Sequence, residues 1–280
     1  MRVLSSKLER TRRSIDEVNA VPLDDFDGFS PDEMSTILYS PFAEECSVRI
    51  RSQMDTLVLD QSPIFQIARH ILKVTNDTGG LKLTSTGNIA PALVKEIYAR
   101  KYIVDPMIEL GITKLNQEIK WKVLHCTKIV LKMSKLIRTY KGKLLLPKRT
   151  KKCLMNGEYF ELFHIFLNTF TTQFNWAYND SCEDEEIGQV GFLYLLHLIN
   201  KYGAEFRELS FYSDLYFKAF PIFKASKNSL FPIRNDFVIA IRFFDRFAEW
   251  FGFVEIHREQ NRVTGPARVR RTKLLSCLLL

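Results

Sequence analysis

The chain of 280 residues contains the stretch LKLTSTG at residues 81–87 and a related stretch, LLLPKRT, at residues 144–150. Each is a short apolar run that follows a helical pattern and a glycine, and each turns polar before another helical pattern begins. A third version closes the chain, with a helical pattern, Gly252, a run at 253–258, a polar loop and a last run at 268–274. Helix, short strand and helix are the parts of a small winged-helix unit. The sequence therefore predicts a mainly α-helical protein with degenerate winged-helix-like units and a few short β-strands.

Two Ser-Pro pairs mark helix starts. Ser30-Pro31 is followed by Glu33 in the pattern of a capping box, and Ser62-Pro63 repeats the serine and the proline. Phenylalanine is over-used, with 22 residues, and most of them follow the first half. We therefore expect three regions, namely an N-terminal helical and irregular extension at 1–60, a repeat region with two helix-strand-helix units at 61–153, and a Phe-rich helical domain at 154–280 that ends in a winged-helix-like hairpin.

The longest helical pattern of the first half covers residues 116–138, where Val123, Val130 and Ile137 recur every seven residues. A single glycine, Gly87, stands between the first expected strand and the next helix, where a turn is its natural use. Only one hairpin is legible, at the end of the chain. The expected helices of the second half lie near 157–178, 186–202, 207–219 and 229–251, and the hairpin strands at 253–257 and 268–274.

The five cysteines are scattered without a C-x-x-C pair, and the first residues carry charge but no apolar core like that of a signal peptide. The longest apolar run, at residues 190–199, is far shorter than the ~20 residues that span a bilayer. These features predict a cytoplasmic protein with reduced thiols and no membrane partner.

Charge is segregated along the chain although its total is only +8. Residues 95–152 carry 16 Lys/Arg against 4 Asp/Glu, a local +12, and residues 153–200 carry 7 acids and no Lys or Arg. Residues 201–280 return to 14 basic against 8 acidic residues. Such blocks indicate either pairing within the molecule or one basic face presented to a polyanion.

Three groups of basic residues are candidates for contact with nucleic acid, namely a stripe on the long helix, a cluster after the second apolar stretch and the last strand. In a winged-helix unit the hairpin and the helix before it contact DNA. We therefore expect a non-enzymatic nucleic-acid-associated protein that binds double-stranded DNA or another polyanion. The alternative is a helical scaffold that binds a protein partner, with the basic groups solvated or paired with the acidic block. The candidate residues are Lys128, Lys132, Lys135, Lys148, Arg149, Lys151, Lys152, Arg268, Arg270 and Arg271.

No arrangement of residues typical of catalysis is legible. The histidines are isolated, and only His125-Cys126 brings two ligand types together, although neighbours on a helix point about 100° apart and cannot easily hold one ion. Gly79-Gly80 precedes a strand, whereas a nucleotide-binding loop follows one. The acidic run at 183–186 is typical of a solvated loop before a helix. We therefore expect no enzymatic activity, no metal site and no cofactor.

Two blocks carry a resemblance to a known group of proteins. They are FDGFSPDEMSTILYSPF at residues 26–42 and GGLKLTSTGNIAPALVKEIY at residues 79–98. They resemble uncharacterised bacterial proteins with a "GLSP-x-x-M…L-x-Y-x-PF" opening and "LKLT-x-x-GNLP" winged-helix-like repeats. Related repeats occur beside domains named after a plasmid open reading frame. The resemblance covers about the first half of the chain and implies no activity. The second repeat departs from the pattern, since Pro147-Lys148-Arg149 stands where the first repeat has Thr-Ser-Thr.

Overall fold

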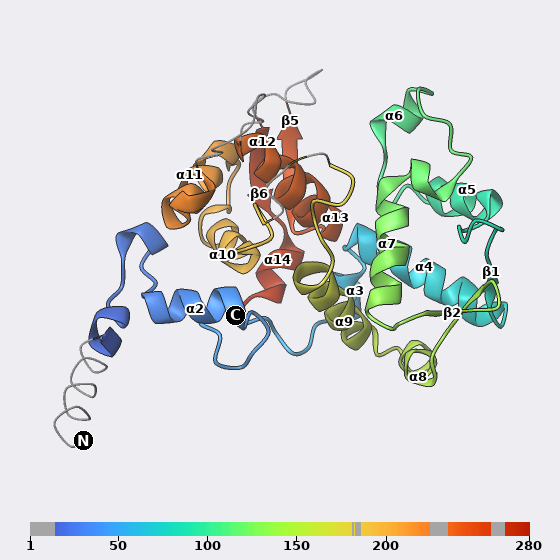
Figure 1. Cartoon of the computed structure of the whole chain (residues 1–280), viewed down its shortest axis with the longest axis horizontal. Coiled ribbons are helices and arrows are strands. Elements are labelled where there is room, and N and C mark those ends of the chain that lie inside the picture. The colour runs from blue at the N-terminus through green and yellow to red at the C-terminus, as the bar shows by residue number, and fades with distance from the viewer. Residues whose placement is uncertain (1–14, 181, 183–185, 225–234, 259–266) are drawn as a thin grey trace, which may run out of the picture.

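The computed structural model describes residues 15–180, 182, 186–224, 235–258 and 267–280. The protein is mainly α-helical, as expected, and its described residues form two small antiparallel sheets (Figure 1). None of the helices in these residues is long and apolar enough to cross a membrane.

The first sheet lies within one run of elements. Its strand order is β1-β3-β2, so the last strand in the chain is the central one. Leu81 of β1 lies opposite Leu144 of β3, and both side chains are buried. The elements of this first unit are α4 (Pro63–Asp77), β1 (Leu81–Lys82), α5 (Pro91–Ala99), α6 (Pro106–Glu109), η2 (Glu118–Lys120), α7 (Lys122–Met133), β2 (Arg138–Tyr140) and β3 (Lys143–Leu145).

This arrangement corrects two expectations. The stretches at 81–87 and 144–150 supply neighbouring strands of one sheet, instead of marking two separate units. The helix expected over 116–138 is shorter, because α7 ends at Met133 and the chain then forms the hairpin β2–β3. The expectation of a single hairpin in the chain is therefore wrong.

If the short helices are left out and residues 235–251 are counted as one helix, the second unit repeats the order of the first, namely helix, strand, helix, helix, strand, strand. Its sheet again has the last strand in the centre, as β4-β6-β5. The expected hairpin at the end of the chain is present. Residues 273–274 are helical, however, because Thr272 caps α14 (Lys273–Leu278) by accepting from the backbone N–H of Leu275. The elements of this unit are α10 (Phe192–Tyr202), β4 (Arg207–Glu208), α11 (Leu209–Ala219), η3 (Pro221–Phe223), α12 (Asn235–Ile239), the π-helix η4 (Ala240–Ala248), α13 (Glu249–Phe251), β5 (Val254–Arg258) and β6 (Ala267–Arg271).

The remaining elements flank the two units. The capping box at Ser30 is formed, since its hydroxyl accepts from the N–H of Glu33 and the Glu33 carboxylate accepts from the N–H of Ser30. Backbone hydrogen bonds tie residues 49–51 to residues 278–280. These elements are η1 (Asp24–Phe26), α2 (Pro31–Tyr39), α3 (Thr56–Leu59), α8 (Lys148–Asn156) and α9 (Tyr159–Thr172).

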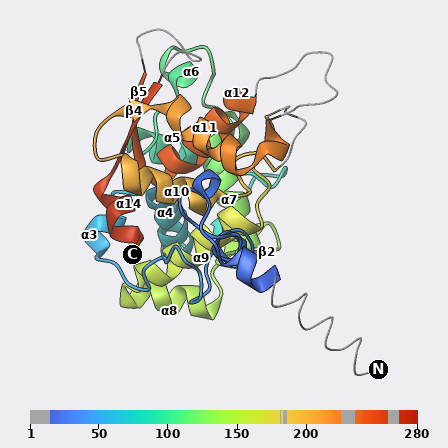
Figure 2. The same ribbon diagram turned by 90° about the vertical axis from the view of Figure 1, so that its left-hand side faces the viewer.

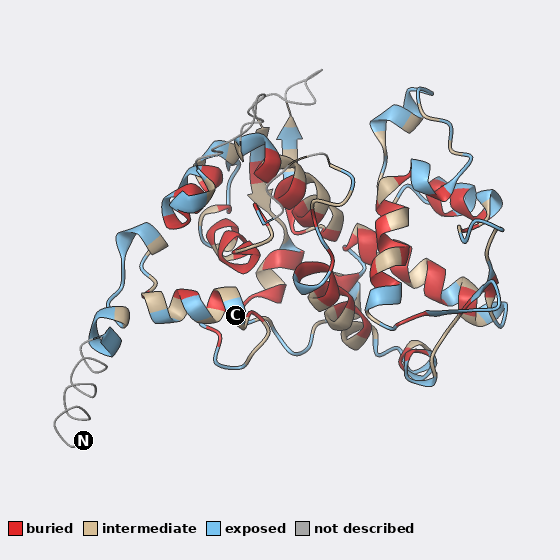
Figure 3. Cartoon of the chain, viewed as in Figure 1, coloured by how far each residue is buried: buried red, intermediate tan, exposed pale blue. Residues whose placement is uncertain are grey.

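An aromatic core joins the units. The ring of Phe65 on α4 lies 5.2 Å from that of Phe163 on α9, and Phe163 lies 6.1 Å from Phe251 on α13. Phe247 of η4 lies 5.2 Å from Phe251 and 4.6 Å from Trp176. Figure 3 shows the buried residues running through both units without a break at α9. The second half therefore has the aromatic core that its phenylalanines predict.

Candidate nucleic-acid interface

One face of the first sheet is basic. Lys82 of β1 and Tyr140 of β2 both lie opposite Lys143 of the central strand β3, so the three side chains form one row on the same side of the sheet. All three are exposed, whereas Leu81 and Leu144 on the other face are buried.

The turn of the hairpin adds a further cation. Tyr140 pairs with Lys143, which leaves a loop of Lys141 and Gly142 with φ values of 46° and 70°. Positive φ at both positions is the geometry of a tight type I′ turn. The ammonium of Lys141 lies 5.3 Å, and the guanidinium of Arg138 5.9 Å, from the centre of the Tyr140 ring. We call Lys82, Arg138, Tyr140, Lys141 and Lys143 the hairpin face.

Basic residues continue on both sides of the hairpin along the chain. Lys132 and Lys135 precede it, and the α8 lysines, Lys148, Lys151 and Lys152, follow three residues after β3 ends. All of them are exposed, and α8 lies at the lower margin of the molecule in Figures 1 and 2. None of these side chains, and none on the hairpin face, forms an ion pair or a hydrogen bond with a residue that the structure describes.

Lys128 does not belong to this exposed surface, so the expected stripe of three lysines on the helix is wrong. Its side chain is buried and its ammonium lies 2.7 Å from the carboxylate of Glu118 and 3.0 Å from the carbonyl oxygen of Gly87. Lys135 is beyond the end of α7, in a left-handed conformation with φ of 58°. Only Lys132 of the three projects from the helix into solvent.

Glu118 is the centre of this buried polar cluster. It also accepts hydrogen bonds from the ring of His125 at 2.6 Å and from the backbone N–H of Ile89 at 2.6 Å. Burial alone would raise the pKa of Glu118, but the hydrogen bonds from His125, Ile89 and Lys128 outweigh it and hold the pKa below its ordinary value. The cluster fixes the loop between β1 and α5 on α7.

The other candidate residues are mostly engaged within the protein. Arg149 donates to Glu161 at 2.7 Å, Arg270 lies 2.6 Å from Glu255, and Arg271 donates to the carbonyl of Asn200. Arg268 is exposed on β6, but this sheet lies apart from the first in both Figure 1 and Figure 2. Within the described part of the chain, the pair of Arg149 and Glu161 is the one salt bridge between residues 95–152 and the acidic block 153–200. Residues Glu183, Asp184 and Glu185 lie outside the described residues.

The helix that precedes the hairpin, α7 in the first unit and the run that ends in α13 in the second, is covered. α7 packs against α4 and α9, and its exposed residues are Lys132 and Met133 in the last turn. In the second unit α13 packs against α4, and Arg242 of η4 is buried with its guanidinium 2.6 Å from Asp180. Neither helix presents a basic face, and the hairpin face is the exposed group of cations on the first sheet.

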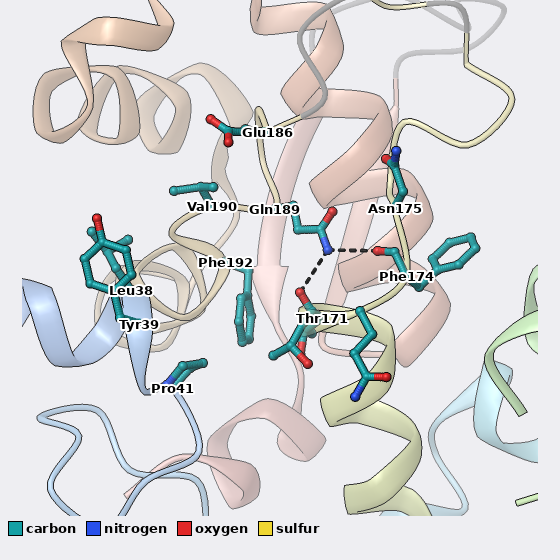
Figure 4. A pocket seen from close by; sticks show the side chains of 12 residues that line it. Leu38, Tyr39, Pro41, Thr171, Phe174, Asn175, Glu186, Gln189, Val190 and Phe192 are labelled. Carbon is teal, nitrogen blue, oxygen red and sulfur yellow. Dashed lines mark hydrogen bonds between the residues drawn. The ribbon is translucent and has the colours of Figure 1, made fainter. Parts of the chain in front are cut away.

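A cavity of about 500 Å³ lies between α2, the end of α9 and the start of α10 (Figure 4). Gln189 lines this cavity. The Gln189 amide donates to the carbonyl oxygens of Thr171 and Phe174 and accepts from the N–H of Trp176. Both N–H groups of this amide are therefore used to hold the end of α9. The cavity shows no pair of side chains placed for acid–base or nucleophilic chemistry.

Cys153, Glu158 and Glu161 have donor atoms within 4.8 Å of one another, a cluster that the sequence did not reveal because a helix break at Gly157 separates its members. Burial, together with the two carboxylates, raises the pKa of the Cys153 thiol to about 11. The thiol is thus protonated at neutral pH when no ion is bound. Arg149 donates a hydrogen bond to the Glu161 carboxylate, so Glu161 already forms an ion pair.

Sequence reasoning missed Lys82, Arg138, Tyr140, Lys141 and Lys143. The signal that was available is Lys141-Gly142 between two short β-compatible runs, which is a weaker form of the Asn-Gly turn pattern.

Residues 60–158 match the family model described as the Y4jL N-terminal domain. The matched segment contains the whole first unit and α8. No curated protein and no solved structure matches the chain.

Proposed function

We propose that the protein is a non-enzymatic nucleic-acid-binding protein, whose hairpin face and α8 lysines contact the phosphate backbone. The observation that carries the proposal is the set of exposed cations from Lys132 to Lys152, which have no acidic partner among the described residues except at Arg149. Phosphates are the partners that such a surface attracts.

Two of these lysines occupy costly backbone positions. Lys135 and Lys141 are both left-handed, with φ of 58° and 46°, where glycine or asparagine is the usual choice. A lysine at such a position costs on the order of 1 kcal/mol. The two lysines therefore cost stability at these positions, and this supports a role for their charge in binding.

The element order and the strand order of both units agree with a winged-helix-like arrangement, in which the hairpin is the wing. Because the helix before each hairpin is covered, we expect contact with the phosphate backbone and not the reading of bases in a major groove. We therefore expect the affinity for nucleic acid to depend weakly on the nucleotide sequence and strongly on the salt concentration.

The test is fluorescence anisotropy with a labelled generic DNA duplex at increasing salt. A variant with Lys141, Lys143, Lys148 and Lys151 changed to Gln should lose most of its affinity, and the slope of log K against log salt should become less steep by up to about 3.6, at 0.9 per phosphate contact. The matched control changes Lys95, Lys114, Lys224 and Lys273 to Gln, which are exposed and lower the net charge equally. Absence of wild-type binding at low salt, or equal loss in both variants, would refute the proposal.

A protein partner is the second candidate, because the segment around α6 exposes several apolar side chains. If this segment binds a second copy of the chain, sedimentation equilibrium should show a dimer that Leu110→Ser and Ile112→Ser abolish. The exposed apolar residues are Val104, Met107, Leu110, Ile112 and Ile119.

A further inference from the structure

We infer that the hairpin face binds unpaired bases, with Tyr140 as the stacking residue, so that single-stranded nucleic acid is preferred over a blunt duplex. This inference rests on the proposed function and deepens it by naming the form of nucleic acid.

The exposure of Tyr140 is the first observation. In a chain whose large aromatic side chains mostly build the core, 53% of Tyr140 is accessible to solvent. The residue sits on a strand of a three-stranded sheet and next to a two-residue turn, so its backbone is held by ladder hydrogen bonds. An exposed ring on a rigid support loses little conformational entropy when a base stacks on it.

The surroundings of Tyr140 are the second observation. The ring has cations on three sides, with Arg138 two residues away on the same face, Lys141 in the turn and Lys143 directly across the ladder. Lys82 extends the row beyond Lys143. An aromatic platform bordered by backbone-binding cations is the usual way to hold a single strand without reading its sequence.

A blunt duplex fits this surface less well. Bases in a duplex are stacked on each other, so Tyr140 would meet no free base face, and the covered α7 offers no helix for the major groove. The sheet face then contributes only phosphate contacts. In a single strand it contributes both phosphate contacts and stacking, which is worth roughly 5- to 150-fold in Kd per base.

The experiment compares the full chain and the variants Tyr140→Ala and Tyr140→Phe on three labelled probes, namely a 12-nucleotide deoxythymidine strand, the uridine strand of equal length and a blunt 12-base-pair duplex. Wild type should bind the single strands more tightly than the duplex. Tyr140→Ala should weaken single-strand binding at least 5-fold and weaken duplex binding clearly less, while Tyr140→Phe, which keeps the ring, should bind like wild type. The two single strands separate a DNA ligand from an RNA ligand, since stacking serves both.

Tyr39→Ala is the matched control, because Tyr39 is exposed on α2, away from the hairpin face, and its removal should change no Kd. A thermal melt of each variant confirms folding. Salt-dependent wild-type binding that Tyr140→Ala does not change, or changes equally for duplex and single strand, overturns the stacking role and leaves the proposed function standing. Failure of wild type to bind any probe overturns both.

Discussion

Lys82 and Lys143 lie directly opposite each other on adjacent antiparallel strands of the first sheet, and both ammonium groups face solvent. Like charges at directly opposed positions destabilise a sheet, by about 0.2–1 kcal/mol. A single strand or duplex laid across the sheet would supply the negative charge that this pair lacks.

Replacing Lys82 by Glu should therefore stabilise the free protein and weaken its binding to nucleic acid. The new carboxylate faces Lys143 across the ladder, so we expect a gain of about 0.5 kcal/mol in the free energy of unfolding. Urea denaturation measures the gain, and anisotropy measures the loss. Lys95→Glu on α5, exposed and outside the sheet, should change neither quantity by as much. A less stable Lys82→Glu protein would show that the pair is not repulsive.

Replacing Lys141 by Asn should also stabilise the free protein and weaken its binding to nucleic acid, but for a different reason. Asn accepts the left-handed conformation of a type I′ turn better than Lys does, so the free energy of unfolding should rise by about 0.5–1 kcal/mol. Binding should weaken because a cation beside Tyr140 is lost. Lys141→Arg keeps both the charge and the strained backbone, and it should behave like wild type in both the melt and the binding assay.

The buried pair of Glu118 and Lys128 should govern stability in acid. Glu118→Gln leaves the Lys128 ammonium buried without a counter-charge, which should cost about 3–5 kcal/mol at neutral pH. The double variant with Lys128→Met should recover much of this loss. A double variant as unstable as Glu118→Gln would show that the cluster acts through its contacts to His125 and Ile89 instead.

The pH dependence of this effect follows from the lowered pKa of Glu118. A carboxyl whose folded-state pKa lies below its ordinary value of 4.5 stabilises the protein fully above that value, and the contribution is lost as pH falls through the folded pKa. The difference in stability between wild type and Glu118→Gln should therefore be constant above pH 4.5 and shrink below it. Urea denaturation at stepped pH measures this difference.

Gly87 provides a test of backbone conformation alone. Its φ is 77°, as a turn glycine requires, and a Cβ placed on it would meet no atom within 4 Å. Gly87→Val should thus cost about 1–2 kcal/mol through the strained left-handed backbone, without a clash. Gly87→Asn, which tolerates this conformation, should cost clearly less in a thermal melt. Equal melting of the two variants would show that the loop relaxes.

Much of the fold was predictable, because local signals determine helix starts. Ser30 and Glu33 form the expected capping box, Pro31 begins α2 and Pro63 begins α4. The hairpin β2–β3 was missed because Ile137 continues the seven-residue pattern of Val123 and Val130, although it leads into a strand. Strands of two or three residues are too short to show an alternation of their own.

The candidate site was only partly predictable for a related reason. Lys128 stands in register with Lys132, and nothing in the helical pattern reveals that Glu118 folds back beneath it. The partner of a buried charge is set by tertiary packing, which spacing along one helix cannot show. Cations on the strands and in the turn of β2–β3 became visible only once the hairpin was known.

The series of rings from Phe65 through Phe163 to Phe251 crosses from the first unit to the second by way of α9. Each ring is fully buried, so parting the units would expose all three to water. We therefore expect the two sheets to belong to one cooperative folding unit, because a fragment that stops after β3 or begins at α10 would lack some of the rings that complete its interior. Chemical denaturation of the whole chain should accordingly give a single transition whether it is followed at the first sheet or at the second.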